Sequence, residues 1–182
     1  MNPGRPGELR AETSMDDLVA AVEELRKHVD LLASVPENQG NPPTDLHREL
    51  TAFVVMPFGR EDLQVVYDDY VKPTIEDSCF LKCIRGDDMF GSGVIMADIL
   101  HAIADAEIII ADLTSQNANV FYEVGIAHAT NKRVLLMAQS LDDVPFDLRH
   151  RRVLIYDYSP HGCKLLEQRI KEHVFDMRKQ LM

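Results

Sequence analysis

Residues 107–138, EIIIADLTSQNANVFYEVGIAHATNKRVLLMA, decide the fold of this chain. The apolar runs at 107–111 (EIIIA) and 133–138 (RVLLMA) predict buried strands, because a strand covered on both faces shows no polar alternation. Residues 120–130 between them predict a helix. Strand, helix and strand in this order predict two parallel strands joined by a crossover helix.

The same alternation continues on both sides of this stretch. Further strands are expected at 52–56 (AFVVM), 80–84 and 153–156, and further helices at 63–77, 94–104 and 163–181, where Pro73 kinks or divides the first. Five such strands predict a flavodoxin-like, three-layer α/β/α domain with a parallel sheet in the order 2-1-3-4-5.

The N-terminal part has a different character. Residues 1–13 are polar and rich in Pro and Gly, which predicts disorder, and residues 35–49 have a linker composition. Between them, apolar residues at 14–34 recur at alternating spacings of three and four, as in a coiled-coil seam. We expect an oligomerisation helix there and a homo-oligomer; the alternative is a helix packed on its own α/β domain at 50–182.

Bulk composition excludes several classes of protein. The 182 residues carry a formal net charge of −11, which argues against binding an extended nucleic acid. No apolar stretch is long enough to cross a membrane, so a cytoplasmic location is expected. Three cysteines without CxxC spacing indicate reduced thiols.

The predicted strand order places a ligand crevice between the first and third strands, beyond their carboxyl ends. The loops at 57–62 and 112–119 should line it. Asp112 ends the third strand, and small polar residues suited to sugar hydroxyls or phosphate follow it: Thr114, Ser115, Asn117 and Asn119. We expect Asn119 to cap the next helix, whose free N–H groups would attract an anion.

Glu123 is the main candidate for chemistry. It follows about one turn into that helix, among apolar neighbours that raise a carboxyl pKa, so it is a candidate nucleophile or base. Gly125 is costly within a helix and suggests a close approach to the backbone. The alternative is a solvated glutamate that supports the helix dipole.

Other polar residues are weaker candidates. Arg85 and Asp88 follow the second strand, and Arg85 either pairs with a phosphate or forms a surface ion pair. The basic cluster 149–152 either closes over an anion or is a solvated loop. Asp98 has no assigned role, and His101 and His128 lack metal-ligand spacing, so no metal site is predicted.

The run NANVFYEVGIAHA at 117–129 resembles the glutamate-bearing segment of the nucleoside 2-deoxyribosyltransferase-like family, which is related to bacterial TIR-type domains. FVVMPFG at 53–59, YDDYVKPTI at 67–75 and PFDLRHRRVLIYDY at 145–158 are also similar to its uncharacterised bacterial members. The resemblance covers roughly residues 50–158. It implies that Glu123 attacks the anomeric carbon of a sugar while the base leaves, as in glycoside hydrolysis.

The resemblance also assigns the surrounding residues. The loop after the first strand, Pro57, Phe58 and Gly59, would lie over the nucleobase, with Phe58 stacking on it. The family's transferases carry an aspartate shortly before the glutamate to hold the sugar. Here Asn117 and Asn119 stand nearby and the acidic residue is Asp112, which favours hydrolysis or an altered specificity.

Two hypotheses follow from these residues. The first is an enzyme that cleaves the N-glycosidic bond of a nucleoside, nucleotide or NAD-like substrate without a cofactor, in antiphage defence by analogy with bacterial relatives. In it Glu123 reacts, Asp112, Asn117 and Asn119 orient the sugar, and Phe58 holds the base. The second is a non-catalytic module that senses a nucleotide in the same pocket and signals through oligomerisation.

Overall fold

The computed structural model describes residues 49–86 and 96–179. Asp88 and the predicted segments 1–13 and 14–34, together with residues 35–48 of the predicted linker, lie outside these ranges. Within them, five strands form one parallel sheet in the order β2-β1-β3-β4-β5. The strands are β1 (Thr51–Val55), β2 (Lys82–Arg85), β3 (Ile108–Asp112), β4 (Arg133–Ala138) and β5 (Val153–Ile155). The predicted sheet and its order are confirmed.

The central position of β3 explains why an apolar run in the sequence predicts a buried strand. Every residue of β3 is buried, and β3 pairs with β1 on one side and β4 on the other. A strand in this position meets helices on both faces, so both sets of alternating side chains are apolar. Ile109 pairs with Phe53 of β1 and with Val134 of β4.

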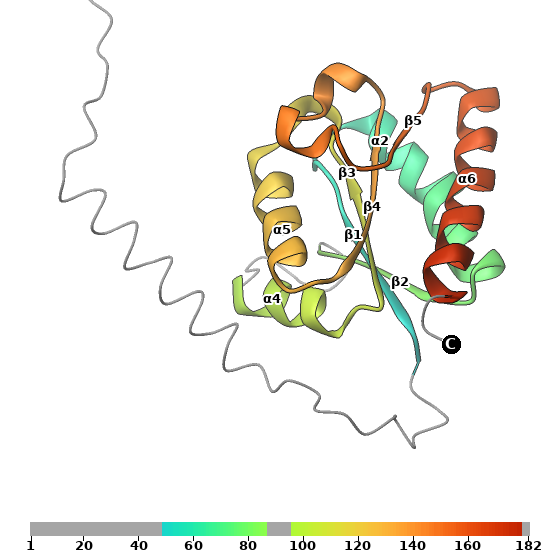
Figure 1. Cartoon of the computed structure of the whole chain (residues 1–182). Helices are drawn as coiled ribbons and strands as arrows, with labels where there is room; N and C mark the ends of the chain where they lie inside the picture. The colour runs from blue at the N-terminus through green and yellow to red at the C-terminus, as the bar shows by residue number, and fades with distance from the viewer. Residues whose placement is uncertain (1–48, 87–95, 180–182) are drawn as a thin grey trace, which may run out of the picture. The chain divides into compact units, whose positions relative to one another are not determined.

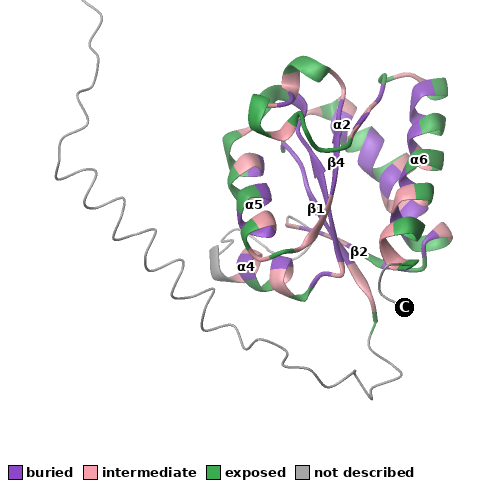
Figure 2. Ribbon diagram, in the orientation of Figure 1, coloured by how far each residue is buried: buried purple, intermediate pink, exposed green. Residues whose placement is uncertain are grey.

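Helices cover both faces of the sheet, which makes three layers (Figure 1). One layer contains α2 (Glu61–Val66), its π-helical continuations η1 (Tyr67–Val71) and η2 (Thr74–Ser78), and α6 (Pro160–Lys179). The other contains α4 (Met96–Asp105) and α5 (Ala118–Ala129). The inward faces of α5 and α6 are buried and their outer faces are exposed, as the colours of Figure 2 show.

The helix expected at 63–77 runs unbroken over residues 61–78, and Pro73 lies inside it with α-helical backbone. Proline has no N–H to donate, so the regular hydrogen-bond pattern cannot continue through it. The chain forms π-helical turns on either side, at η1 and η2. Val71, Thr74 and Ile75 nevertheless stay buried against the sheet layer.

The last helix begins three residues earlier than expected, at Pro160. Proline is favoured at the first helical position because its missing N–H would have no partner there. Ser159 precedes it, and its hydroxyl oxygen accepts a hydrogen bond from the Gly162 N–H at 3.0 Å. Cys163, the expected first residue, lies buried within the first turn.

The three cysteines, Cys79, Cys83 and Cys163, are buried and not joined in disulfides. Over residues 49–86 and 96–179, no helix combines the length and apolar character needed to span a bilayer.

Candidate functional site

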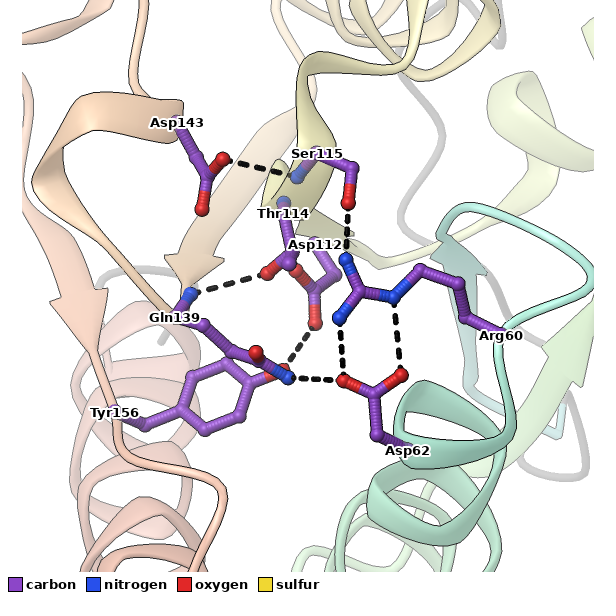
Figure 3. A network of polar contacts seen from close by, with 8 residues as sticks. All are labelled: Arg60, Asp62, Asp112, Thr114, Ser115, Gln139, Asp143 and Tyr156. Atoms are coloured by element: carbon purple, nitrogen blue, oxygen red, sulfur yellow. Dashed lines mark hydrogen bonds and ion pairs between the residues drawn. The ribbon is translucent and has the colours of Figure 1, made fainter.

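Polar side chains from four strand ends meet at the carboxyl edge of the sheet (Figure 3). They come from the last residue of β3, from the segments that follow β1, β3 and β4, including the first turn of α2, and from the residue after β5. Eight side chains form the network: Arg60, Asp62, Asp112, Thr114, Ser115, Gln139, Asp143 and Tyr156. The loops after β1 and β3 flank the point where the strand order reverses, the usual place for a ligand in such a sheet.

Asp112 lies at the bottom of this network. Its side chain is 2% exposed, and both carboxylate oxygens accept hydrogen bonds: Oδ1 from the Thr114 N–H at 2.9 Å and Oδ2 from the Tyr156 hydroxyl at 2.7 Å. Burial raises the pKa of Asp112, while the bonds from Thr114 and Tyr156 act in the opposite direction. Burial and the Asp112 charge also raise the pKa of Tyr156. A contact between Asp112 and a ligand would require Tyr156 to move.

Arg60 and Asp62 form a two-pronged ion pair above Asp112. The Arg60 guanidinium donates from Nε to Asp62 Oδ1 at 3.0 Å and from Nη2 to Oδ2 at 2.6 Å. The Gln139 side-chain amide donates to the same Oδ2 at 2.9 Å. The hydrogen bond from Arg60 lowers the pKa of Asp62 to about 2, so this carboxylate is ionised at neutral pH.

The loop between β3 and α5 has an unusual backbone. Ser115 and Gln116 both have positive φ, +69° and +54°, a region that residues other than glycine rarely adopt. Neighbouring loops hold both residues. The Ser115 N–H donates to Asp143 Oδ1 at 3.0 Å, and the Gln116 side chain donates to the Asp142 carbonyl at 2.6 Å.

The start of α5 corrects one expectation. Asn117, and not Asn119, is the N-cap: its side-chain oxygen accepts from the N–H groups of Asn119 at 2.9 Å and Val120 at 3.3 Å. The capping role depends on extended backbone, which Asn117 has and a residue inside the helix lacks. Two of the N–H groups expected to attract an anion are therefore already occupied.

Glu123 lies in the second turn of α5 and is half-buried. Burial raises its pKa from 4.5 to about 7, so the carboxyl is close to half-protonated at neutral pH. In the part of the chain that the structure describes, no hydrogen bond or ion pair to the Glu123 carboxyl is found. Burial, and not a bonding partner among the described residues, therefore sets the pKa of Glu123.

Gly125 does not confirm the expected close approach. A Cβ at this position would have no atom within 4 Å among the described residues, and Gly125 is exposed. The glycine therefore has no packing explanation within this part of the chain.

The two candidate carboxyl groups lie on opposite sides of the sheet. Ile108, Ile110 and Tyr156 belong to the core shared with α2 and α6, and side chains alternate along a strand, so Asp112 faces that layer. Glu123 lies on α5, in the other layer. The structure does not bring Asp112 and Glu123 together.

Helical geometry gives the direction of Glu123. His128 lies about 140° away around α5, at 100° per residue. His128 has a pKa lowered by burial and by the nearby charges of Arg151 and His150, which come just before β5. His128 therefore faces the β5 side, and Glu123 lies on the flank of α5 that is turned away from it.

The loop after β1 is partly open. Pro57 is buried, Phe58 is 62% exposed, and Gly59 has a φ of +79°, which only glycine adopts without strain. Phe58 Cζ lies 3.9 Å from where a Cβ would stand on Gly86, so the ring extends over the end of β2. An exposed aromatic ring beside the switch point is available for stacking.

Arg85 is not a surface residue, so the expected surface ion pair is wrong. Its side chain is 5% exposed, its guanidinium carbon lies 4.1 Å from the centre of the Tyr67 ring, and Nη1 donates to Gln64 Oε1 at 3.0 Å. Arg85 and the buried Cys83 stand two positions apart on β2, so their side chains point to the same face of the sheet, the one that α2 covers.

A hollow of about 310 Å³ runs beside α4. Phe53 and Ile84 line it from the sheet, and Asp98, His101 and Asp105 line it from the helix. Among the described residues, His, Cys, Asp and Glu side chains form no group of three that could hold a metal ion.

Sequence reasoning missed Arg60, Asp62, Gln139 and Tyr156. Arg60, Asp62 and Gln139 follow carboxyl ends of predicted strands, and the first two lie inside the loop 57–62 that the strand order pointed to; Tyr156 is the last residue of the strand expected at 153–156. Position alone could therefore have selected them. Which of these side chains bond to one another could not be predicted from the sequence, because the partners come from different loops.

No protein-family model matches the chain, and no curated protein matches it. Among solved structures, the chain is similar to a 2-desoxiribosyltransferase from Leishmania mexicana, with a TM-score of 0.42 and 20% sequence identity. The match covers 50% of this chain and 65% of that one, so this chain spans less than two thirds of that protein's length. The fold described above rests on the strand order and not on this likeness.

Proposed function

We propose that this protein cleaves the N-glycosidic bond of a nucleoside, nucleotide or NAD-like substrate, with Glu123 as the reacting carboxyl group. The environment of Glu123 carries the proposal. A half-buried carboxyl with a pKa raised to about 7, and with no hydrogen bond from the described residues, is disposed to react with a ligand and contributes nothing to internal bonding.

The chemistry follows from the electron demand at the sugar. As the bond between the anomeric carbon and the base nitrogen breaks, positive charge develops on the ring oxygen and the anomeric carbon. The ionised Glu123 either stabilises this charge or bonds to the anomeric carbon, and water or a second acceptor then takes the sugar. The bond electrons leave with the base: a purine or pyrimidine takes up the proton that the incoming water or acceptor hydroxyl releases, whereas nicotinamide leaves as a neutral molecule without one.

Other residues have supporting roles in this proposal. Phe58 stacks on the base, and Pro57 and Gly59 shape the loop that carries it. Asn119, which is exposed, contacts the sugar or its phosphate, whereas Thr114 is buried and its N–H and Oγ1 are bonded to Asp112 and Gln139. Asp112 and Asn117 keep the β3–α5 loop and the start of α5 in place, because their oxygens are already bonded to protein groups.

A sensing module that binds a nucleotide without cleaving it is the second candidate. The internal bonds of Asp112 and Asn117 favour it, since two residues expected to hold the sugar are used by the protein itself. Signalling through a helix at 14–34 belongs to this candidate.

The test is release of a free base, measured by liquid chromatography, from a panel of nucleosides, nucleotides and NAD. The enzyme would be supported if the wild type and Glu76→Gln release a base and Glu123→Gln does not. Glu76→Gln is the control, because Glu76 is an exposed glutamate in the opposite layer. Release that survives in Glu123→Gln would remove the proposed role. No release, with a raised melting temperature on adding one compound, would support the sensor. For an active enzyme, loss of phage protection in cells carrying Glu123→Gln would extend the proposal to antiphage defence.

A further inference from the structure

The polar network at the carboxyl edge includes a closed ring of bonds that the chemistry at Glu123 does not explain. Arg60 is bonded to Asp62, Asp62 accepts from Gln139, and the Gln139 backbone N–H donates to Thr114 Oγ1 at 3.0 Å. Ser115 follows Thr114 in the chain, and its hydroxyl oxygen accepts from Arg60 Nη1, which closes the ring (Figure 3).

We propose that Arg60 and Asp62 are positioning residues, which hold the β3–α5 loop and the start of α5 in the conformation that the Glu123 site requires. This inference rests on the proposed function. Neither residue needs to touch the reacting atoms, because each acts through the loop.

The backbone of the loop supports this role. Ser115 and Gln116 are consecutive residues with positive φ, and neither is glycine. Such a conformation persists only where the surrounding structure holds it. The restraints on Ser115 come from two sides, the Arg60 guanidinium after β1 and the Asp143 carboxylate after β4.

The geometry of Arg60 suits it to hold Ser115 in a fixed position. Two parallel bonds to Asp62 fix the plane of the guanidinium, which leaves Nη1 pointing at Ser115. A lysine keeps the charge but cannot form this planar fork. Because Asp62 stays ionised well below neutral pH, the pair persists across the working range.

The loop is directly connected to Glu123. Asn117 follows Gln116 and caps α5, and Glu123 lies six residues beyond the cap, about 9 Å along the helix at 1.5 Å per residue. A change in the backbone at Ser115 and Gln116 would turn the helix start and move Glu123 with it.

The first measurement is hydrogen exchange at residues 113–118, by mass spectrometry. In Arg60→Met these amides should exchange about tenfold faster or more, with a smaller increase in Arg60→Lys and Asp62→Asn. The matched control is Arg178→Met, because Arg178 also holds a backbone carbonyl, that of Cys79 at 2.8 Å, but lies far along the chain in α6. It should leave exchange at 113–118 unchanged.

The second measurement uses the substrate found in the base-release panel. Arg60→Met should lower kcat about tenfold or more with KM little changed, and Arg60→Lys should recover part of the loss. The pH midpoint of kcat should move from near 7 towards the ordinary carboxyl value as Glu123 becomes better solvated. A purely stabilising role would lower only the melting temperature.

Unchanged exchange at 113–118 in Arg60→Met would overturn the inference, and so would an unchanged kcat and pH midpoint in an active enzyme. If the wild type releases no base from any compound, the proposed function has failed by itself. The exchange experiment would then still decide whether Arg60 and Asp62 hold the loop.

Discussion

Replacing Glu123 with glutamine is expected to change the pH dependence of stability in a specific way. The pKa of Glu123 is about 7 in the folded protein, against an ordinary value of 4.5 for a glutamate side chain. Because the folded-state pKa is raised, the stabilising contribution of this carboxyl is fully present below pH 4.5 and is lost as the pH rises to about 7. Glutamine stays neutral, so the variant should gain stability relative to the wild type over this interval.

The size of the effect follows from the same pKa values. One pKa unit corresponds to about 1.36 kcal/mol, so full burial would make the difference about 3 kcal/mol above pH 7. Glu123 is only half-buried, and solvent screening reduces this to roughly 1–2 kcal/mol. Above pH 7 the difference should stay constant.

Urea unfolding of both proteins at half-unit steps from pH 4.5 to 8.5 measures this directly. The quantity to compare is the free energy of unfolding of Glu123→Gln minus that of the wild type. Glu76→Gln, at an exposed position, controls for the substitution itself. A difference for Glu123→Gln that stays the same from pH 4.5 to 8.5 would refute the reasoning, because the carboxyl would then titrate alike in the folded and unfolded chains.

Three further predictions concern the frame of the site. Tyr156→Phe removes the hydroxyl that bonds Asp112 at 2.7 Å and should lower the free energy of unfolding by about 1–3 kcal/mol in urea titrations; no change would mean that Asp112 finds another donor. Asn117→Ala should cost about 1 kcal/mol through the lost cap, whereas Asn119→Ala should cost less than about 0.5 kcal/mol; the reverse order by thermal unfolding would show that Asn119 caps the helix. Gly125→Ala should stabilise the protein by about 0.5–1 kcal/mol, because the site is helical and open; a lower melting temperature would reveal an unseen contact at this face.

The sheet could be predicted from the sequence because its strands carry the signal along their whole length. Residues 133–138 have the same bounds in the structure, and β3 differs from the expected strand by one residue at each end. The ends of helices were harder to predict from the sequence, because the position of each end depends on a single capping residue. At Asn117 and Asn119 two suitable side chains stand two positions apart, and only the extended backbone of Asn117 distinguishes them.

The meeting of the loops at the candidate site could be predicted from the sequence, but their bonding could not. The loops after β1 and β3 do meet at the expected edge, and the pKa of Glu123 is raised as its apolar neighbours suggested. Arg85 was judged by its charge and by its place after the strand expected at 80–84, whereas it is the last residue of β2 and its side chain points to the same buried face as that of Cys83. The longest-range bond of the ring joins Asp62 and Gln139, 77 positions apart, and local patterns contain no information on such distant partners.

The sheet also separates the two groups of candidate residues, which lie on its opposite faces. Glu123 and its helix belong to one compartment, and Asp112 and Tyr156 belong to the other; only the loops at the rim communicate between them. Substitutions deep in one compartment should therefore combine additively with those in the other. Under the proposed function, the residues around Glu123 can then be varied to change ligand preference while the Asp112 and Tyr156 side of the sheet is left unchanged.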